Sequence, residues 1–347
     1  MTIPVTTRLA AADLIKMQTP PDRRLEISYS DDFSPPSDAH NLLLGFHFGS
    51  KLSRETHPAI INLQLRPLNR DQLFEGWWYK GEVTHTSTGL VNIAECDDYT
   101  VALVQREAVK ADAAREQARE AYFHLLEAVA ATRHTNLVKV WNYFGDINSG
   151  DDDQEKYRQF SIGRAEAFSD ANLREENMPT GTAIGTANGS GLSLIALASN
   201  NSFLPAENPR QVSAFHYPRQ YGPRSPKFSR GGLVTSKDHK LVLISGTAAV
   251  VGHESNYPYD TKLQLNETFK NLEFLCASIS NLDQEISQFE LDDKSVLRVY
   301  LKDPGDFDLV AEKIYKKFNG TNRNVAFLHG TICRKELTVE IDGVKVS

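Results

Sequence analysis

The chain has 347 residues, a formal net charge of −7 at pH 7, and the apolar and charged content of a water-soluble globular protein. This acidity, without any long run of Lys and Arg, excludes a typical nucleic-acid-binding protein. No apolar run approaches the roughly 20 residues that a membrane-spanning helix needs, and the first 24 residues lack the apolar core of a signal peptide. The three cysteines cannot all pair with one another, which favours a reducing compartment. We therefore expect a cytoplasmic enzyme or small-molecule-binding protein.

The first half of the chain reads as strands followed by a helix. Residues 1–39 are rich in Pro, Ser and Asp, which predicts little regular structure beyond one or two short strands. β-Branched and aromatic residues between Gly, Pro, Asn and Asp then predict strands at 42–49, 59–68, 76–83, 90–97 and 99–108. A helix within 111–132, leading to a strand at 136–144, is predicted by apolar residues at helical spacing, namely Ala118, Tyr122, Leu125, Leu126 and Val129. The acidic run 151–153 is interpreted as a solvated loop.

A middle block, 157–199, has spaced glycines before an apolar run. Two interpretations are open: a loop that cradles phosphate, or a glycine-rich turn that enters a buried strand. The block contains neither G-x-x-x-x-G-K-[ST] nor a G-x-G-x-x-G between a strand and a helix. The turn is therefore the better interpretation.

The second half repeats the order of the first. It predicts a hairpin at 233–252, helices at 263–278 and 306–318, and strands at 296–303, 325–333 and 337–344. The first helix of each half carries the pattern Gln-x-x-Glu-x-aromatic-x-x-Leu, which starts at Gln117 and at Gln264. The shared order and pattern predict a duplication within an α+β fold, with helices on one face of each mixed sheet. We expect an N-terminal domain at 1–145, a connecting segment at 146–225 that contributes to a pocket, and a C-terminal domain at 226–347.

The stretch 208–230 concentrates arginines, aromatic residues and four prolines. Proline fixes its own φ and favours an extended residue before it, so the segment should be stiff and non-helical. A stiff segment with guanidinium groups and phenols is suited to bidentate capture of carboxylates. We interpret it as the wall of a pocket for a small dianion, with a basic surface loop as the alternative.

Near the C-terminus, Cys333 and Glu340 fall on strands that should be adjacent. If Glu340 points inward, loss of solvation raises its pKa and makes it a candidate general acid. The two-residue period of a strand instead favours Val339 and Ile341 in the core and Glu340 in solvent. Zinc-binding and serine-hydrolase patterns, H-E-x-x-H, C-x-x-C and G-x-S-x-G, do not occur.

At these residues the chain resembles the chorismatases, a family that removes pyruvate from chorismate. The resemblance rests on five segments spread from about residue 140 onward: YRQFSIGRAEAF, NPRQVSAFHYPRQYGPRSP, ISGTAAVVGHES, LRVYLKDP and HGTICRKELTVEIDG. It implies two domains related to the trimeric YjgF-type deaminase fold, in agreement with the internal repeat.

The resemblance also implies roles for individual residues. Glu340 matches the catalytic glutamate of the family, which reverses the orientation that strand spacing favours. Gly246 and Cys333 match two pocket positions that separate its subtypes, and a Gly/Cys pair resembles those that form 3-hydroxybenzoate, alone or with 4-hydroxybenzoate. Cys333 would act in catalysis by shaping the pocket or as a thiolate. The substrate carries two carboxylates, for which the candidates are Arg164, Arg219 and Arg298, with Tyr157 and Tyr217 as further hydrogen-bond donors.

The expected protein is thus a cytoplasmic, monomeric chorismatase that needs no metal or other cofactor and binds neither nucleic acid nor membrane. Two alternatives are open. Subtypes with small, alanine-like residues at the two pocket positions hydrolyse chorismate to a dihydroxycyclohexadiene carboxylic acid. A protein of the YjgF type could also bind an aromatic acid without turnover.

Overall fold

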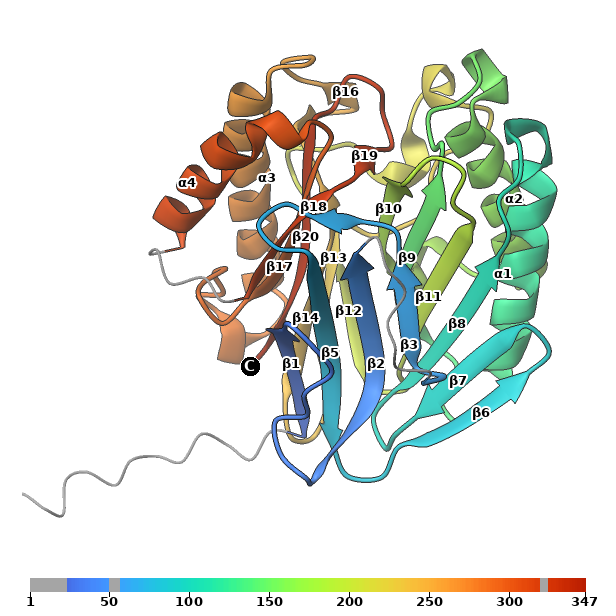
Figure 1. The fold of residues 1–347 in the computed structure, drawn as a ribbon, viewed down its shortest axis with the longest axis vertical. Coiled ribbons are helices and arrows are strands. Elements are labelled where there is room, and N and C mark those ends of the chain that lie inside the picture. The colour runs from blue at the N-terminus through green and yellow to red at the C-terminus, as the bar shows by residue number, and fades with distance from the viewer. Residues whose placement is uncertain (1–23, 50–56, 319–323) are drawn as a thin grey trace, which may run out of the picture.

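The computed structural model describes residues 24–49, 57–318 and 324–347. The expectation that the first 24 residues hold no signal peptide lies almost wholly outside these ranges. The fold is α+β, as predicted: three sheets surround a central core, and four helices cover the outer faces of two of them (Figure 1). No helix among the described residues combines the length and the apolar character needed to cross a membrane.

The first seven-stranded sheet carries helices α1 (Ala114–Ala130) and α2 (Lys156–Asp170) on its outer face. Its strand order is β19 (Thr331–Ile332), β10 (Thr180–Thr186), β9 (Leu137–Gly145), β11 (Leu192–Ala198), β8 (Thr100–Arg106), β7 (Val91–Glu95) and β6 (Thr84–Thr88). The glycine-rich turn predicted in the middle block joins β10 to the buried strand β11.

The second seven-stranded sheet carries α3 (Thr261–Ser280) and α4 (Phe307–Lys317). Its strand order is β12 (Ser202–Ala206), β13 (Gly231–Thr235), β14 (Lys240–Thr247), β20 (Val339–Val346), β17 (Val296–Leu301), β18 (Val325–His329) and β4 (Arg66–Pro67). A two-stranded ribbon, β15 (Val250–Val251) and β16 (Glu254–Ser255), follows β14.

The predicted duplication is confirmed by the strand order. The series β7-β8-β11-β9-β10 in one sheet corresponds to β13-β14-β20-β17-β18 in the other, and in both series only the last pair is parallel. The matching helices bury corresponding positions, for example Ala118 with Leu265 and Leu125 with Leu272. The segment 146–225 contributes β10 and β11 to the first sheet and β12 to the second, and the predicted domain boundaries at 145 and 225 stay a prediction.

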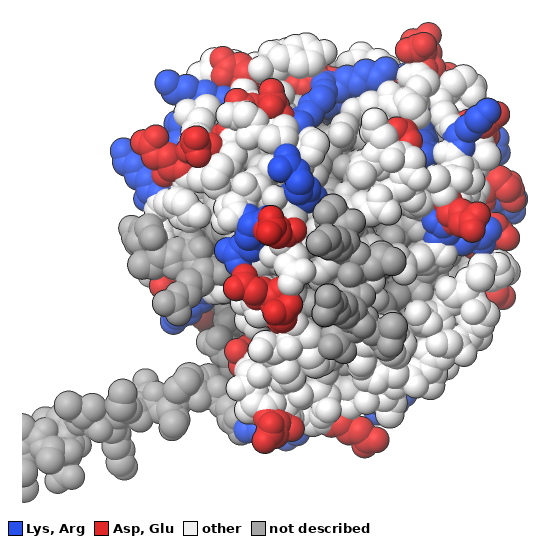
Figure 2. All heavy atoms as spheres, viewed as in Figure 1, with Lys and Arg blue, Asp and Glu red and all other residues white. Residues whose placement is uncertain are grey.

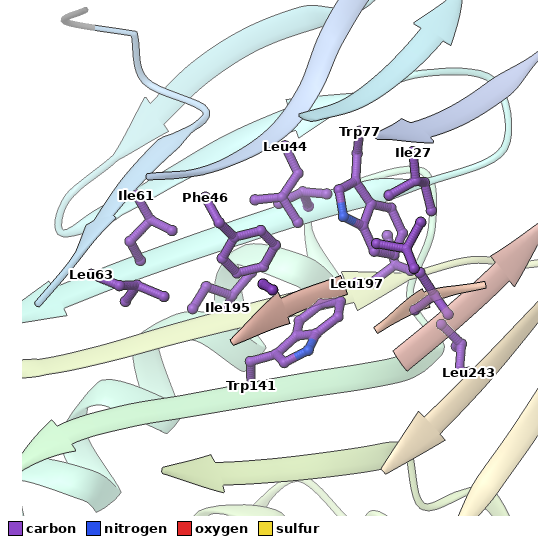
Figure 3. Close-up of a cluster of buried hydrophobic side chains, with 14 of the residues drawn as sticks. Ile27, Leu44, Phe46, Ile61, Leu63, Trp77, Trp141, Ile195, Leu197 and Leu243 are labelled. Atoms are coloured by element: carbon purple, nitrogen blue, oxygen red, sulfur yellow. The ribbon is translucent and has the colours of Figure 1, made fainter. Parts of the chain in front are cut away.

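A four-stranded sheet without a helix closes the third side of the molecule, in the order β1 (Leu25–Ser30), β5 (Gln72–Lys80), β2 (His40–Gly49) and β3 (Ile60–Leu63). Its inner face meets both seven-stranded sheets in one apolar cluster (Figure 3). Trp77 and Phe46 of this sheet pack edge-on against Trp141 of β9, with ring centroids 5.7 and 5.5 Å apart. Each seven-stranded sheet is therefore covered on both faces, by helices outside and by this core inside.

Charged side chains of both signs are interspersed on the described part of the face drawn in Figure 2.

Candidate active site

A cavity of about 500 Å³ is lined by residues from both halves of the chain. Its walls come from the start of α2, the proline-rich segment, the end of β14 and the stretch from Cys333 to Glu340. Five of the predicted site residues line it, namely Tyr157, Tyr217, Gly246, Cys333 and Glu340. The proline-rich segment is thus a pocket wall, as the sequence suggested, with two 3₁₀ turns at Ala214–His216 and Arg219–Tyr221.

Glu340 lies on the inner face of β20 and is only 4% exposed. Its neighbours Val339 and Ile341 pack under α3 and α4 on the other face of the strand. Strand spacing therefore places Val339 and Ile341 correctly in the core but is wrong about Glu340, because it assumes a sheet with one solvent-exposed face, whereas both faces of this sheet are buried. Glu340 faces the end of β14 so closely that a Cβ atom added to Gly246 would collide with its Oε1 atom.

The surroundings of Glu340 favour its protonated form. Burial is the main cause that raises its pKa to about 8, and the carboxylate of Asp342 raises it further, while Lys139 and Arg230 act in the opposite direction. A carboxylic acid with this pKa is mostly neutral at pH 7 and can donate a proton to a bound molecule.

Arginine side chains at or near the cavity have buried nitrogens without a hydrogen-bond partner among the described residues. Arg334 lies over the rings of Tyr221 and Tyr217, its Cζ atom 3.9 and 5.0 Å from their centroids. Its Nη1 donates to the His253 carbonyl oxygen and to Ser255 Oγ, at 2.9 and 3.0 Å. Its Nη2 is buried and has no hydrogen-bond partner among the described residues. Arg334 is thus held in place with one donor left for an acceptor in the cavity.

Arg230 and Arg164 extend this set of donors. Arg230 lines the cavity and donates from Nη2 to Tyr217 Oη at 2.7 Å, while its buried Nε has no partner among the described residues. Arg164 is 3% exposed, and its Nε and Nη2 likewise lack partners within the described part of the chain. Arg164 is not itself a lining residue, but it shares one face of α2 with Tyr157 and Ser161, which are.

Two neutral donors, Tyr157 and Cys333, also line the cavity. Burial raises the pKa of the Tyr157 phenol, which keeps it protonated near neutral pH. Burial also raises the pKa of the Cys333 thiol to about 12, and the nearby Glu340 adds to that shift. Cys333 therefore faces the cavity as a thiol, a small and partly apolar group, rather than as a thiolate.

Besides Arg164, two other arginines predicted to bind substrate are not lining residues of the cavity. The side chain of Arg219 is 66% exposed and forms a bidentate pair with Asp153, at 2.8 and 2.5 Å. Arg298 is fully enclosed in the molecule, where it pairs with Glu75 at 2.5 Å and with Asp342 at 3.4 Å and stacks on Phe46. Both guanidinium groups already have carboxylate partners.

Three arginines that line the cavity, Arg158, Arg230 and Arg334, were left out of the predicted site, and the sequence pointed to one of them. Arg230 belongs to the proline-rich segment, but its composition does not tell which of its five cations turns inward. Arg334 follows Cys333 directly, and adjacent residues on a regular strand would point apart. Only the turn after the short strand β19 brings both to the cavity.

Comparisons with known proteins show which family the chain belongs to. The sequence model of the family described as "Chorismatase FkbO/Hyg5-like, N-terminal" matches residues 75–198. A 3-hydroxybenzoate synthase from Streptomyces hygroscopicus is 34% identical over 236 residues, which cover 66% of this chain and 69% of that protein. A chorismatase from the same organism is 32% identical over 227 residues, or 64% of this chain and 65% of the relative.

A solved structure supports the same relationship over almost the whole chain. The crystal structure of a chorismatase superposes with a TM-score of 0.82 at 25% sequence identity, covering 92% of this chain and 98% of the other. The resemblance found in the sequence is therefore confirmed: the chain belongs to the chorismatase family.

Proposed function

We propose that this protein removes pyruvate from chorismate and forms a hydroxybenzoate, chiefly 3-hydroxybenzoate. The observation that carries the proposal is a buried carboxyl group, Glu340, whose pKa burial raises to about 8, in a cavity where Arg230 and Arg334 each have a guanidinium nitrogen without a partner among the described residues. The relative named 3-hydroxybenzoate synthase supports this choice of product.

In the proposed reaction Glu340 donates its proton to the methylene carbon of the enolpyruvyl ether. The ether carbon then acquires positive charge. The Glu340 carboxylate left behind stabilises this charge, and the interaction is stronger in a buried site than in water. To give 3-hydroxybenzoate, the neighbouring ring hydroxyl oxygen bonds to the ether-bearing ring carbon as that carbon's bond to the ether oxygen breaks, and the ether oxygen leaves in pyruvate. The hydroxyl proton returns to the Glu340 carboxylate, and the ring epoxide then opens and loses a ring proton to become aromatic. Pyruvate and hydroxybenzoate together therefore balance chorismate without another reactant. The dihydroxy acid, by contrast, requires one molecule of water.

Charged and neutral donors would hold the substrate for this step. Arg334, Arg230 and Arg164 each keep at least one buried N–H without a partner among the described residues, which suits the two carboxylates of chorismate. Arg219 and Arg298 are already paired with carboxylates outside the cavity. We therefore assign the binding of the substrate carboxylates to Arg230 and Arg334 instead. The phenols of Tyr157 and Tyr217 would add hydrogen bonds.

Gly246 and Cys333 would determine which product forms from the ring of the substrate. Both line the cavity beside Glu340, and neither brings a charged group to it near neutral pH. A thiol opposite a glycine leaves room for the ring but offers no strong acceptor to orient a water molecule. Aromatisation would then be faster than capture by water.

Activity is tested by incubating purified, EDTA-treated protein with chorismate and following pyruvate, with chromatography of the aromatic product. Pyruvate with 3-hydroxybenzoate is the expected result. Pyruvate with the dihydroxy acid would establish the hydrolase alternative. No pyruvate above the spontaneous rate, with an aromatic acid bound in calorimetry, would establish a binding protein without turnover.

We further propose that the protein acts as a monomer in the cytoplasm and binds chorismate without nucleic acid or membrane. The duplication supports the monomer, since one chain supplies both walls of the cavity. Light scattering of the purified protein should give about 38.8 kDa, the mass of one chain.

A further inference from the structure

Behind Glu340, outside the cavity lining, two opposite charges are buried. Lys139 of β9 and Asp342 of β20 are both 0% exposed. Lys139 Nζ donates to the Ile244 carbonyl oxygen at 2.7 Å and to Thr182 Oγ1 at 3.0 Å. It lies 3.8 Å from Asp342 Oδ2. A buried ammonium group held by three oxygen atoms is costly to keep, and the proposed proton transfer does not use it directly.

The carboxylate of Asp342 is also fixed by several hydrogen bonds. Its Oδ2 accepts hydrogen bonds from Thr182 Oγ1 at 2.7 Å, from Trp141 Nε1 at 3.1 Å and from Arg298 Nη1 at 3.4 Å. Its Oδ1 accepts one from the Tyr300 phenol at 3.4 Å. Residues 340 and 342 lie on the same face of β20, so their Cα atoms are roughly 6–7 Å apart.

These contacts balance charge without Glu340. Lys139 and Arg298 supply two positive charges, and Asp342 and Glu75 supply two negative charges. An ionised Glu340, itself only 4% exposed, would add a third negative charge beside these groups. This excess explains in geometric terms why the neutral acid is the resting form.

Other groups face Glu340, and they differ in what they can do. Arg230 approaches from the segment before β13, Tyr157 from α2 and Cys333 from the stretch after β19, and all three line the cavity, where a substrate can reach them. On the neighbouring strand β17, Tyr300 pairs with Glu340. Its phenol is hydrogen-bonded to Tyr143 and Asp342. Of the charged groups that act on the Glu340 carboxyl, Lys139 and Asp342 lie outside the cavity lining, and burial lowers the pKa of the Lys139 ammonium group to about 8.

We propose that Lys139 and Asp342 are positioning residues that set the proton affinity of Glu340, Asp342 by opposing its ionised form and Lys139 by supporting it. The proposal deepens the proposed function, on which it rests. It predicts opposite effects from two neighbouring substitutions, which a purely structural role of the pair would not produce.

The test is the pH profile of kcat/KM in Asp342→Asn and Lys139→Met. The acid must be protonated in the free enzyme, so activity falls as pH rises through the pKa of Glu340. Asp342→Asn removes a like charge, and the fall should move to lower pH by about one unit. Lys139→Met removes an opposite charge, and the fall should move to higher pH by a similar amount.

Lys156→Met is the matched control. Lys156 is also buried and its Nζ donates to a backbone oxygen, that of Gly145, but it lines a different cavity. Its loss should leave the fall in activity at the wild-type pH. Two variants that shift the profile in the same direction, or not at all, while retaining the wild-type circular dichroism spectrum, would overturn the proposal.

A second measurement does not depend on turnover. The carbonyl stretch of a protonated buried carboxyl, assigned to Glu340 by its loss in Glu340→Gln, can be followed by infrared difference spectroscopy against pH. In the wild type the band should persist above pH 7, and in Asp342→Asn it should disappear at lower pH. Disappearance below pH 6 in the wild type overturns the proposal even if a variant does not fold. A wild type without pyruvate release would instead refute the proposed function, and the infrared titration would still decide the role of the pair.

Discussion

At the scale of single residues, the assignment of Glu340 as the acid has a direct test. Glu340→Gln keeps the size of the side chain but cannot donate a proton, so kcat should fall about 10²–10⁴-fold. The affinity for chorismate, measured by calorimetry, should change little. In the wild type, kcat/KM should decline as pH rises through about 8, where Glu340 loses its proton. Near-native turnover by the variant would remove Glu340 from the mechanism.

Gly246 and Cys333 should behave as a coupled pair. The methyl group of Gly246→Ala collides with the Glu340 carboxyl, so this single change should slow pyruvate release. Cys333→Ala removes a sulfur atom from the same cavity and makes room for the carboxyl to move. We therefore expect the double variant to recover pyruvate release and to shift the product from hydroxybenzoate toward the dihydroxy acid, as resolved by chromatography.

A double variant that forms only hydroxybenzoate would show that the pair does not set the product. If the effects of the two single changes on rate simply add, the steric coupling through Glu340 is absent.

Arg334 and Arg219 form a matched comparison for substrate anchoring. Arg334→Ala removes the stacked guanidinium with a free buried donor, and KM for chorismate should rise at least tenfold. Arg219→Ala breaks only an exposed pair with Asp153, and KM should stay within a factor of about two. A large rise in KM for Arg219→Ala and none for Arg334→Ala would reverse the assignment.

At the scale of elements, the strands and three of the outer helices, α1, α3 and α4, follow from local patterns, whereas α2 does not. Its first half is YRQFSIG, where polar residues and Gly163 interrupt the apolar spacing. The structure explains the interruption: α2 packs against α1 so closely that an added Cβ at Gly163 would collide with the Arg115 carbonyl oxygen. Contact with α1 determines which residues α2 can carry, and this cannot be recognised from the sequence of α2 alone.

Gly163 therefore supplies a prediction about stability. Alanine has the higher helix propensity, worth about 1 kcal/mol in an isolated helix. At this contact the methyl group forces α1 and α2 apart, so Gly163→Ala should lower the free energy of unfolding by about 1–3 kcal/mol. Urea denaturation measures the difference, and Ser169→Ala, an exposed position of α2, is the control. A variant more stable than the wild type would contradict the close contact.

At the scale of the whole molecule, the duplication could be predicted but the inner face of the sheets could not. The order of elements and the shared helix pattern suffice for the repeat. Val339 is buried under the helices, but whether Glu340 is buried as well depends on what covers the other face of β20, and that cover comes from distant segments, β5, β2 and β9. The same long-range packing buries Arg298 outside the proposed substrate cavity, although the segment LRVYLKDP around it resembles the chorismatases.

Arg298 connects strands that belong to different sheets and lie far apart in the sequence. It pairs with Glu75 of β5 and Asp342 of β20, and its guanidinium lies over Phe46 and Trp141, 4.3 and 5.2 Å from their ring centroids. Removal of one partner from a buried pair leaves the other charge uncompensated, at a cost of about 3–5 kcal/mol. Arg298→Met should lower the free energy of unfolding by that amount, and the folded fraction should retain a near-native KM for chorismate.

The double variant Arg298→Met with Glu75→Gln separates the two possible roles of this arginine. It removes both charges, so it should regain part of the stability that Arg298→Met loses, since no uncompensated carboxylate remains beside Phe46 and Trp141. A substrate anchor would behave differently, because neutralising Glu75 could not replace a guanidinium group that binds chorismate. Unchanged stability in Arg298→Met together with a raised KM would therefore restore the role suggested by the sequence. Recovery of stability with KM near the wild-type value would identify Arg298 as the charge that binds the third sheet to the other two.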